Sequence, residues 1–125
     1  MSSGILGLRT AIYHVADLQA ARDWYTQQFG VAPYFDEPFY VGFDIGGYEL
    51  GLLPSESSST GKEESVVAYW GVGNIQEAYD RFLSRGAIEW EAPTEVGEGI
   101  VVAKVKDPWG NVIGLIYNPN FHAKV

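Results

Sequence analysis

The stretch GYELGLL, residues 47–53, returns later in the chain as GNVIGLI, residues 110–116. Both copies have glycine at the same two positions and aliphatic residues at the same three. Each copy follows a turn signal, IGG at residues 45–47 and DPWG at residues 107–110, so each indicates a strand that leaves a hairpin. This repetition predicts that one structural module occurs twice in the chain.

A second pair of matching segments lies upstream of these copies. DLQAARDWY at residues 17–25 aligns with NIQEAYDRF at residues 74–82, with shared Gln, Ala and Asp and an aromatic residue in the last place. Asp and Asn are favoured caps at the start of a helix, and Gly30 and Gly86 are placed to end one. The sequence therefore predicts one helix in each module, over residues 17–29 and 74–85.

Alternating, β-rich segments surround both helices and give each half the order β-α-β-β-β. Between the halves, PSESSSTGKEES at residues 54–65 is polar and low in complexity, which indicates a flexible connection. We expect a single domain, residues 1–125, with module one at about 6–54, the connection at about 55–65 and module two at about 66–118. The predicted strands are residues 8–15, around 34–35, 39–45, 47–53, 66–72, 88–92, 100–106 and 111–117.

The composition of the 125 residues is that of a folded domain, since 46% are hydrophobic. The chain has no cysteine, which excludes disulfides, thiol catalysis and thiolate metal sites. With no apolar run near 18 residues and no signal peptide, we expect a soluble cytoplasmic protein. The net charge of −8 would repel nucleic acid and anionic membranes, or it only keeps the protein soluble.

From Leu8 to about Asn118 the sequence resembles the vicinal oxygen chelate superfamily, the group of glyoxalase I, bleomycin-resistance proteins and extradiol dioxygenases. The resemblance rests on the repeated module, on VADLQAARDWYTQQFG at residues 15–30 and on DPWGNVIGLI at residues 107–116. It implies an α+β fold in which two tandem β-α-β-β-β modules form a curved mixed sheet around a cleft, with the helices outside. It does not imply one reaction, because the superfamily includes lyases, isomerases, dioxygenases and drug-sequestering proteins.

Members that bind a metal ion hold it with His or Glu from the first and last strands of each module. The internal repeat places those positions at Thr10, Val67, Gly51 and Gly114 in this chain. A divalent metal needs imidazole nitrogen or carboxylate oxygen converging on one point, and of these residues only threonine could serve, poorly. The resemblance therefore implies a member that lacks the metal ligands, and we expect neither a metal ion nor another cofactor.

A rescue of the metal site by His14 and Glu49 is also disfavoured. The first and fourth strands of a module run parallel in the family fold, and these two residues lie on opposite sides of the ligand positions on their strands. We expect an offset of about six residues, or roughly 20 Å at ~3.3 Å per residue. Neither a shared metal nor an acid–base dyad is expected from this pair.

The sheet face that the helices leave uncovered should line a cleft. A two-residue Gly46-Gly47 turn would pair Asp44 with Glu49 and Gly42 with Gly51 across the hairpin. The glycines leave volume for an organic ligand, or they only mark strand twist or close packing. The predicted ligand-binding residues are His14, Tyr40, Asp44, Glu49, Gly51, Tyr69, Trp90 and Gly114.

Several of these residues have a plain structural alternative. His14 could be a general base or a structural residue. Asp44 and Glu49 could split their pKa values for acid–base work, or they are solvated at the hairpin tip. Trp90 lies between two glutamates and could stack on a planar cation, or it belongs to an edge hairpin.

The favoured hypothesis is a metal-free small-molecule binding protein that resembles bleomycin-resistance proteins. It would sequester an aromatic or cationic organic ligand without turnover, as a homodimer. The alternative is a glyoxalase-like enzyme that works without the usual metal and uses His14, Asp44 or Tyr69 as acid–base groups. A third hypothesis is a vestigial domain that acts in protein association.

Overall fold

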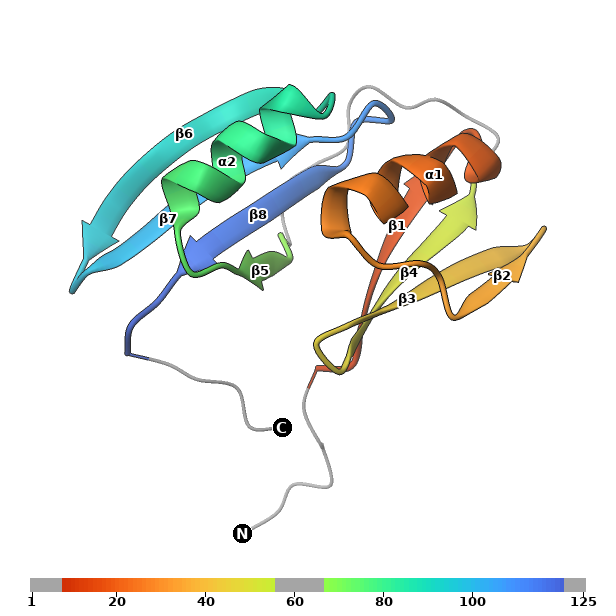
Figure 1. Ribbon diagram of the computed structural model, residues 1–125, viewed down its shortest axis with the longest axis horizontal. Coiled ribbons are helices and arrows are strands. Elements are labelled where there is room, and N and C mark those ends of the chain that lie inside the picture. Colours follow the sequence, from red (N-terminus) through yellow and green to blue (C-terminus); the bar gives the residue numbers. More distant parts are fainter. Residues whose placement is uncertain (1–7, 56–66, 121–125) are drawn as a thin grey trace, which may run out of the picture. The chain divides into compact units, whose positions relative to one another are not determined.

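The computed structural model describes residues 8–55 and 67–120, which fall into two compact units that divide after Ser55. Each unit has one helix and one four-stranded mixed sheet, so the α+β class and the paired β-α-β-β-β order are confirmed (Figure 1). Below, module one denotes residues 8–55 and module two residues 67–120. Most of the connection expected at residues 55–65, and the first residue of the strand expected at 66–72, lie outside the described residues.

Module one contains a sheet with the strand order β1-β4-β3-β2. Its first strand pairs in parallel with β4, and the other two pairings are antiparallel. The chain between these parallel strands contains α1, β2 and β3, so it is long enough for the crossover that a parallel pairing requires. The elements are β1 (Thr10–Val15), α1 (Leu18–Phe29), β2 (Phe35–Glu37), β3 (Tyr40–Ile45) and β4 (Tyr48–Pro54).

Module two repeats this topology with the order β5-β8-β7-β6 and one parallel pair, β5 with β8. Its elements are β5 (Tyr69–Gly71), α2 (Ile75–Ser84), β6 (Ile88–Gly97), β7 (Ile100–Lys106) and β8 (Val112–Tyr117). The modules therefore form two separately hydrogen-bonded sheets, each complete in itself.

Both helices begin and end where the sequence predicts. The Asp17 side chain accepts a hydrogen bond of 3.0 Å from the Ala20 N–H, and Asn74 accepts one of 3.0 Å from the Glu77 N–H. These bonds satisfy N–H groups that the first turn of a helix leaves unpaired. Gly30 ends α1 in the left-handed conformation with φ of 70°, which glycine adopts without steric cost.

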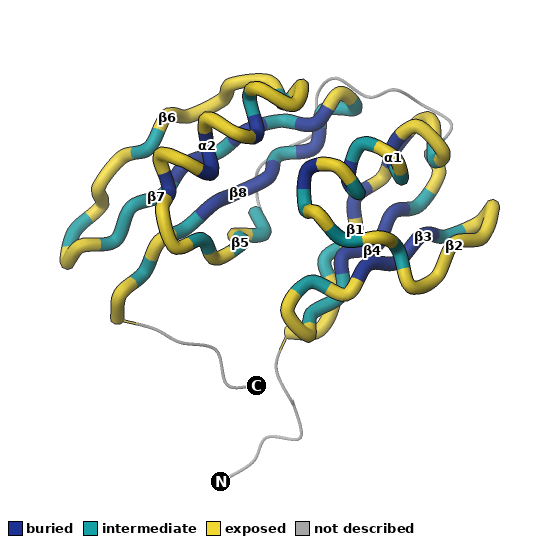
Figure 2. Tube along the Cα trace, in the orientation of Figure 1, coloured by how far each residue is buried: buried dark blue, intermediate teal, exposed yellow. Residues whose placement is uncertain are grey.

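Each helix covers one face of its own sheet, and the dark blue segments of Figure 2 mark the buried residues of the two modules. Side chains alternate between the two faces of a strand, so on β1 Tyr13 and Val15 are buried whereas Thr10, Ile12 and His14 are exposed, as predicted. We call the side of a sheet opposite its helix the open face. The buried apolar residues are Tyr13, Val15, Ala21, Tyr25, Val41, Phe43, Leu50 and Leu52 in module one, and Ile75, Ala78, Tyr79, Phe82, Ala103, Val105, Ile113 and Leu115 in module two.

The strand predicted at residues 8–15 begins at Thr10, and the one predicted around residues 34–35 lies at Phe35–Glu37. Two other strand predictions differ more from the structure in extent. The strand expected at residues 88–92 continues to Gly97 because register shifts after Glu89, Glu91 and Glu95 accommodate Pro93 on an edge strand. The strand expected at residues 66–72 is reduced to Tyr69–Gly71 among the described residues.

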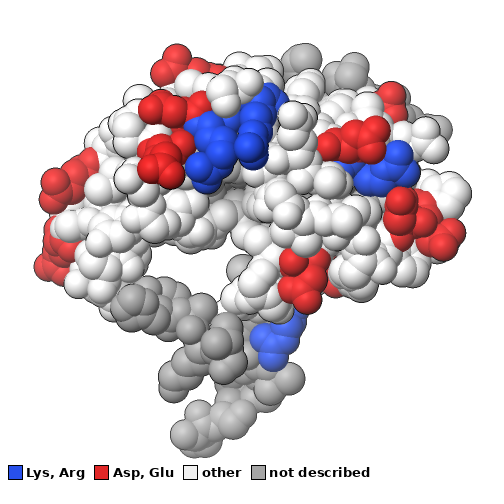
Figure 3. Space-filling model, viewed as in Figure 1, with Lys and Arg blue, Asp and Glu red and all other residues white. Residues whose placement is uncertain are grey.

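Acidic side chains lie at several points on the visible surface of both modules, in keeping with the net charge of −8 (Figure 3). Neither α1 nor α2, the helices found within residues 8–55 and 67–120, has the length and apolar character needed to span a membrane.

Candidate functional site

The β3–β4 hairpin positions the carboxylates of the candidate site. Its two-residue turn at Gly46 and Gly47 places Asp44 opposite Glu49, as predicted. The Asp44 carboxylate accepts a hydrogen bond of 2.8 Å from the Gly47 N–H. Asp44 therefore stabilises the turn in addition to contributing negative charge beside Glu49.

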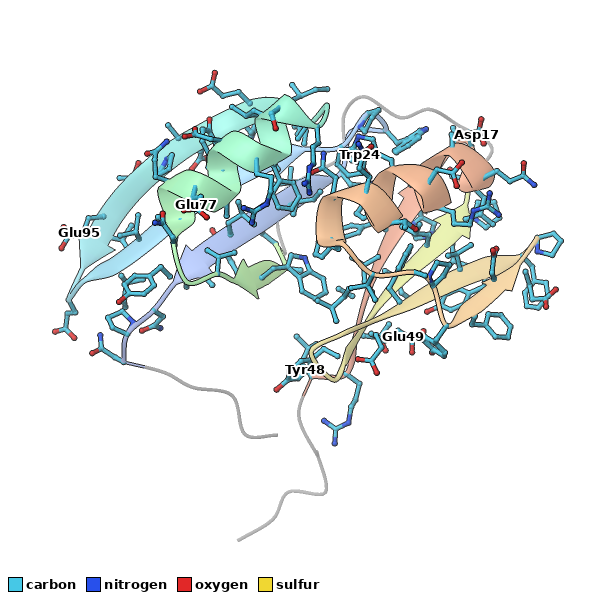
Figure 4. The ribbon with its side chains drawn as sticks, in the orientation of Figure 1. Asp17, Trp24, Tyr48, Glu49, Glu77 and Glu95 are labelled. Carbon is cyan, nitrogen blue, oxygen red and sulfur yellow. The ribbon has the colours of Figure 1, made fainter. Side chains whose placement is uncertain are left out.

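Glu49 is the centre of a cluster with two tyrosines on the open face of module one. The Tyr40 hydroxyl donates a short hydrogen bond to Glu49 Oε2, and the Tyr34 hydroxyl also hydrogen-bonds to the Glu49 carboxylate. A backbone bond of 3.0 Å from the Tyr34 N–H to the Gly42 carbonyl holds Tyr34 beside the hairpin. Figure 4 shows Glu49 on the side of the sheet away from α1.

The two phenols are held in their protonated, hydrogen-bond-donating form. Burial and the hydrogen bond to Glu49 raise the pKa of Tyr40 well above its usual value of 10.0. The hydrogen bond to Glu49, followed by burial, raises the pKa of Tyr34. Ionising either phenol would place a second negative charge beside Glu49, so both act as donors and Glu49 as the acceptor.

A hollow of about 160 Å³ lies next to this cluster. Two carboxylates and two phenol rings line it, so its surface combines negative charge with aromatic faces. The lining residues are Tyr34, Asp44, Gly47, Tyr48 and Glu49.

The space above Gly51 is filled by the ring of Tyr40. A Cβ atom at position 51 would lie 2.8 Å from Cζ and 2.9 Å from Cε1 of that ring. At the paired position 42, a Cβ would lie 3.0 Å from Glu49 Oε2. It would also lie 3.2 Å from Cε1 of Tyr34 and 3.2 Å from Cε2 of Tyr40. The expectation of open volume above Gly51 is therefore corrected: the missing side chains allow Tyr40 to lie directly on the backbone.

Gly114 of module two is covered in a related way. Its partners are Tyr69 on β5 and Lys104 on β7. A Cβ at position 114 would lie 2.6 Å from Cδ1 of Tyr69 and 2.9 Å from the backbone oxygen of Ala68. Because a backbone atom cannot rotate away, close packing is one reason for this glycine.

The four positions that the family resemblance assigns to metal ligands do not fit a metal here. Tyrosine rings cover Gly51 and Gly114, which have no donor atom, and Val67 has none either. Thr10 supplies a hydroxyl and pairs with Glu49 across β1 and β4. Within residues 8–55 and 67–120, no three His, Asp or Glu side chains gather as a metal site would require.

His14 lies apart from the cluster. It pairs with Leu53, four residues along β1 from Thr10, the partner of Glu49. The expected offset of six was too large because Gly51 pairs with Ile12 and not with Thr10. Four residues still correspond to about 13 Å along a strand, too far for a dyad.

Trp90 already has a cation on its ring. The ammonium of Lys106 lies 3.5 Å from the ring centroid, and the side chain of Trp90 is exposed. The flanking carboxylates are also engaged: Glu89 accepts a 2.7 Å bond from the Tyr79 hydroxyl, and Glu91 pairs with Lys104 at 3.4 Å.

The structure thus brings Tyr40, Asp44, Glu49 and Gly51 together in module one, and it places Tyr69, Trp90 and Gly114 on the open face of module two. The sequence predictions missed Tyr34, Lys104 and Lys106. The two lysines alternate along the correctly predicted strand 100–106, so a common face was predictable. Tyr34 precedes a short, irregular strand and gave no such signal.

Comparison with known proteins agrees with this architecture. A curated relative, the uncharacterised protein YurT of Bacillus subtilis, is 27% identical over 122 residues, covering 86% of this chain and 94% of its own. A glyoxalase-related enzyme from Fulvimarina pelagi has a TM-score of 0.77 at 19% identity, with 96% of this chain and 94% of that chain covered. A lactoylglutathione lyase from Agrobacterium tumefaciens has a TM-score of 0.74 at 20% identity, with coverages of 94% and 99%.

At these identities the solved structures establish likeness of fold and not of activity. The family itself is established by sequence, because the profile of one superfamily matches residues 7–115, nearly the whole chain. The chain belongs to the glyoxalase/bleomycin resistance protein/dioxygenase superfamily.

Proposed function

We propose that the chain binds a small organic cation on the open face of module one, without a metal ion and without turnover. The observation that carries this proposal is the carboxylate of Glu49 held between Tyr34 and Tyr40. Sequestration of this kind is one of the activities found in the superfamily, alongside its metal-dependent reactions. The residues at the metal positions favour the binding role, since they do not supply the donors that the reactions need.

The cluster suits a cation for chemical reasons. An ionised carboxylate has about four lone-pair sites, and two tyrosine hydroxyls use part of that capacity at Glu49. Asp44, directly across the hairpin, adds a second carboxylate. The faces of tyrosine rings also attract an ammonium or guanidinium group, by about 0.5–2 kcal/mol.

The size of the hollow limits what enters it. Pockets that bury whole drug-sized ligands measure roughly 300–1,000 Å³, whereas this hollow measures about 160 Å³. It therefore accommodates a cationic head group, and the remainder of a larger ligand would extend over the open face. The exposed rings of Phe35 and Phe39, 5.9 Å apart, offer apolar surface in the same module.

The test compares a planar cation with its neutral counterpart. Benzamidine, which is cationic at pH 7, and neutral benzamide are titrated into the protein by isothermal calorimetry. We expect saturable binding of benzamidine, at least about tenfold weaker binding after Glu49→Gln, and little binding of benzamide. Glu89→Gln is the matched control, because Glu89 also accepts a tyrosine hydroxyl but lies on β6 of module two.

Equal binding of benzamide and benzamidine would contradict a cation site. So would a Glu49→Gln variant that binds benzamidine like the parent, or a Glu89→Gln variant that loses binding to the same extent.

A metal-free enzyme is the second candidate, and the hydrogen bond between Tyr40 and Glu49 favours it specifically. A carboxylate could accept a proton from a substrate while a protonated phenol donates a hydrogen bond to a developing oxyanion. Mass spectrometry of bound compounds after long incubation distinguishes the candidates. Product formation that Glu49→Gln abolishes would replace the binding role by an enzymatic one.

We also propose that the protein is a homodimer, because each module leaves strands at the edges of its sheet and such edges are commonly paired or covered. Light scattering at micromolar concentration should report twice the chain mass of 13.8 kDa. A measured mass of one chain would contradict this proposal.

A further inference from the structure

On the open face of module two, Lys106 occupies the ladder position that Asp44 occupies in module one, and Lys104 occupies that of Gly42. In module one Asp44 pairs with Glu49, two residues along from the Gly42–Gly51 pair. In module two Lys106 pairs with Val112, two residues along from the pair of Lys104 with Gly114. The two lysines lie on the open face, because the alternate residues of β7, Ala103 and Val105, are buried under α2.

These are the lysines that fall within residues 8–55 and 67–120, and both lie on this one face.

Gly114 is flanked by hydrogen-bond donors on both sides. Tyr69 lies beside it on β5 with its ring against the glycine, and Lys104 lies beside it on β7. The Lys104 side chain is only 16% exposed, and its ammonium pairs at 3.4 Å with Glu91, whose side chain is 55% exposed. A largely covered ammonium is thus paired with a solvated carboxylate that an incoming anion can displace.

Lys106 adds a second cation at a defined place. Its ammonium lies 3.5 Å from the centroid of the Trp90 ring, so the ring orients the side chain along the open face. Tyr69 and Trp90 are both exposed, with Trp90 beside the ammonium of Lys106 and Tyr69 across Gly114 from Lys104.

We propose that Lys104 and Lys106, together with Tyr69, form an anion-binding site in module two that takes the carboxylate of an aromatic acid. An ammonium offers three donors and a phenol one, and bonds from charged donors to oxyanions are stronger than neutral ones. The site involves residues of module two alone and is independent of the cation site proposed for module one.

The experiment titrates sodium benzoate, inorganic phosphate and neutral benzamide into the protein at constant ionic strength, with binding measured by calorimetry. We expect saturable binding of benzoate and at least about tenfold weaker binding after Lys104→Met, with a smaller loss after Lys106→Met. Glu91→Gln should strengthen benzoate binding severalfold, because it removes the competing carboxylate. Arg81→Met is the matched control, since it removes an ion-paired cation of module two from α2, where Arg81 pairs with Glu77 at 3.9 Å.

The proposal is overturned if Lys104→Met binds benzoate like the parent, or if Arg81→Met weakens binding equally, which would indicate a general charge effect. Benzamide binding as tightly as benzoate would exclude an anion site, and tighter binding of phosphate would exclude the carboxylate assignment. If Lys104→Met does not fold, Glu91→Gln decides alone: stronger benzoate binding supports the site, and unchanged or weaker binding refutes it.

Discussion

Module one and module two share a strand order and a helix position, yet their open faces differ in charge. In module one the last-strand glycine lies beneath a phenol that donates to a carboxylate, as Tyr40 does to Glu49. In module two the corresponding glycine lies beneath the ring of Tyr69 and pairs with Lys104 on the neighbouring strand. The helix-facing side of each sheet preserves the fold, whereas the open face is free to change its chemistry, so one duplicated module supports two different surfaces.

The largest difference between the modules should be in how much stability is lost when the aspartate of the last hairpin turn is replaced. Asp107 is fully buried, and its carboxylate accepts bonds from the Trp109 and Asn111 N–H groups at 2.9 and 2.8 Å and from the Asn111 side chain at 2.8 Å. Asp107→Ala would leave at least two of these donors without an acceptor, at about 1–3 kcal/mol each. We expect a loss of about 4 kcal/mol in the free energy of unfolding, measured by urea denaturation.

Asp44→Ala is the comparison variant, because exposed Asp44 accepts one bond, from the Gly47 N–H. Its expected cost is about 1 kcal/mol. Equal losses in the free energy of unfolding for Asp107→Ala and Asp44→Ala would show that burial of the aspartate does not determine its contribution to stability.

The second largest difference should be in the stability lost when a side chain is added at each of the two last-strand glycines. A Cβ at Gly114 meets the backbone oxygen of Ala68 as well as the ring of Tyr69, whereas the three atoms nearest to a Cβ at Gly51 all belong to the Tyr40 side chain. Overpacking costs about 1–3 kcal/mol, so we expect Gly114→Ala near 3 and Gly51→Ala near 1 kcal/mol in urea denaturation. Gly51→Ala should also weaken benzamidine binding, because Tyr40 must leave Glu49. A Gly51→Ala variant less stable than Gly114→Ala would reverse this comparison.

Features that depend on backbone periodicity were predictable from the sequence. The caps Asp17 and Asn74, the strand 100–106 and the pairing of Asp44 with Glu49 follow from local rules that hold without knowledge of the packing. The extension of β6 past Pro93 was not predictable in the same way, because bulges on an edge strand relax the rule that proline ends a strand.

The candidate site was predictable only in part. Alternation places Tyr40 and Gly51 on one face, but it does not indicate that the ring of Tyr40 lies on Gly51 instead of pointing outward. That outcome depends on a rotamer and on the hydrogen bond to Glu49, which couples residues nine positions apart. For the same reason the participation of Tyr34, which binds Glu49 across the sheet, was missed.

The tyrosine–glutamate pair of module two should produce a measurable pH dependence. Burial and the hydrogen bond to Glu89 raise the pKa of Tyr79 from 10.0 to about 12. A folded-state pKa above the unfolded value means that the stabilisation is complete below pH ~10 and is lost as the pH rises toward about 12. Because Glu89 is exposed and screened by solvent, we expect a loss of about 1 kcal/mol.

Denaturation of the parent and of Tyr79→Phe at pH 9, 10, 11 and 12 tests this expectation. The variant should lose less stability over that interval. Tyr40→Phe, which removes the corresponding phenol of module one, is the companion variant, and its effect should extend to higher pH because the pKa of Tyr40 is raised further. Parallel pH curves for the parent and Tyr79→Phe would contradict the assignment.

The smallest expected change in stability comes from the positive-φ positions of two hairpin turns, β3–β4 and β6–β7. In the first, Gly46 and Gly47 occupy the positive-φ positions, at 61° and 92°. In the second, Glu98 adopts φ of 56° between two glycines. A non-glycine residue in the left-handed region costs about 1–2 kcal/mol, and asparagine tolerates this region better than glutamate. We therefore expect Glu98→Asn to stabilise the protein by about 0.5 kcal/mol, since it keeps the Cβ that restrains the unfolded chain.

The matched variant is Gly47→Ala, which forces a Cβ into the same region of backbone conformation in module one. Apart from its chain neighbours, no residue has an atom within 4 Å of that Cβ, so a loss of stability there reports backbone conformation and not crowding. We expect a loss of about 1 kcal/mol. Because the backbone oxygen of Glu98 accepts the 2.9 Å bond from the Asn120 side chain, Glu98→Asn leaves that contact in place. A lower melting temperature for Glu98→Asn would mean that its carboxylate, and not its backbone, determines the stability of the turn.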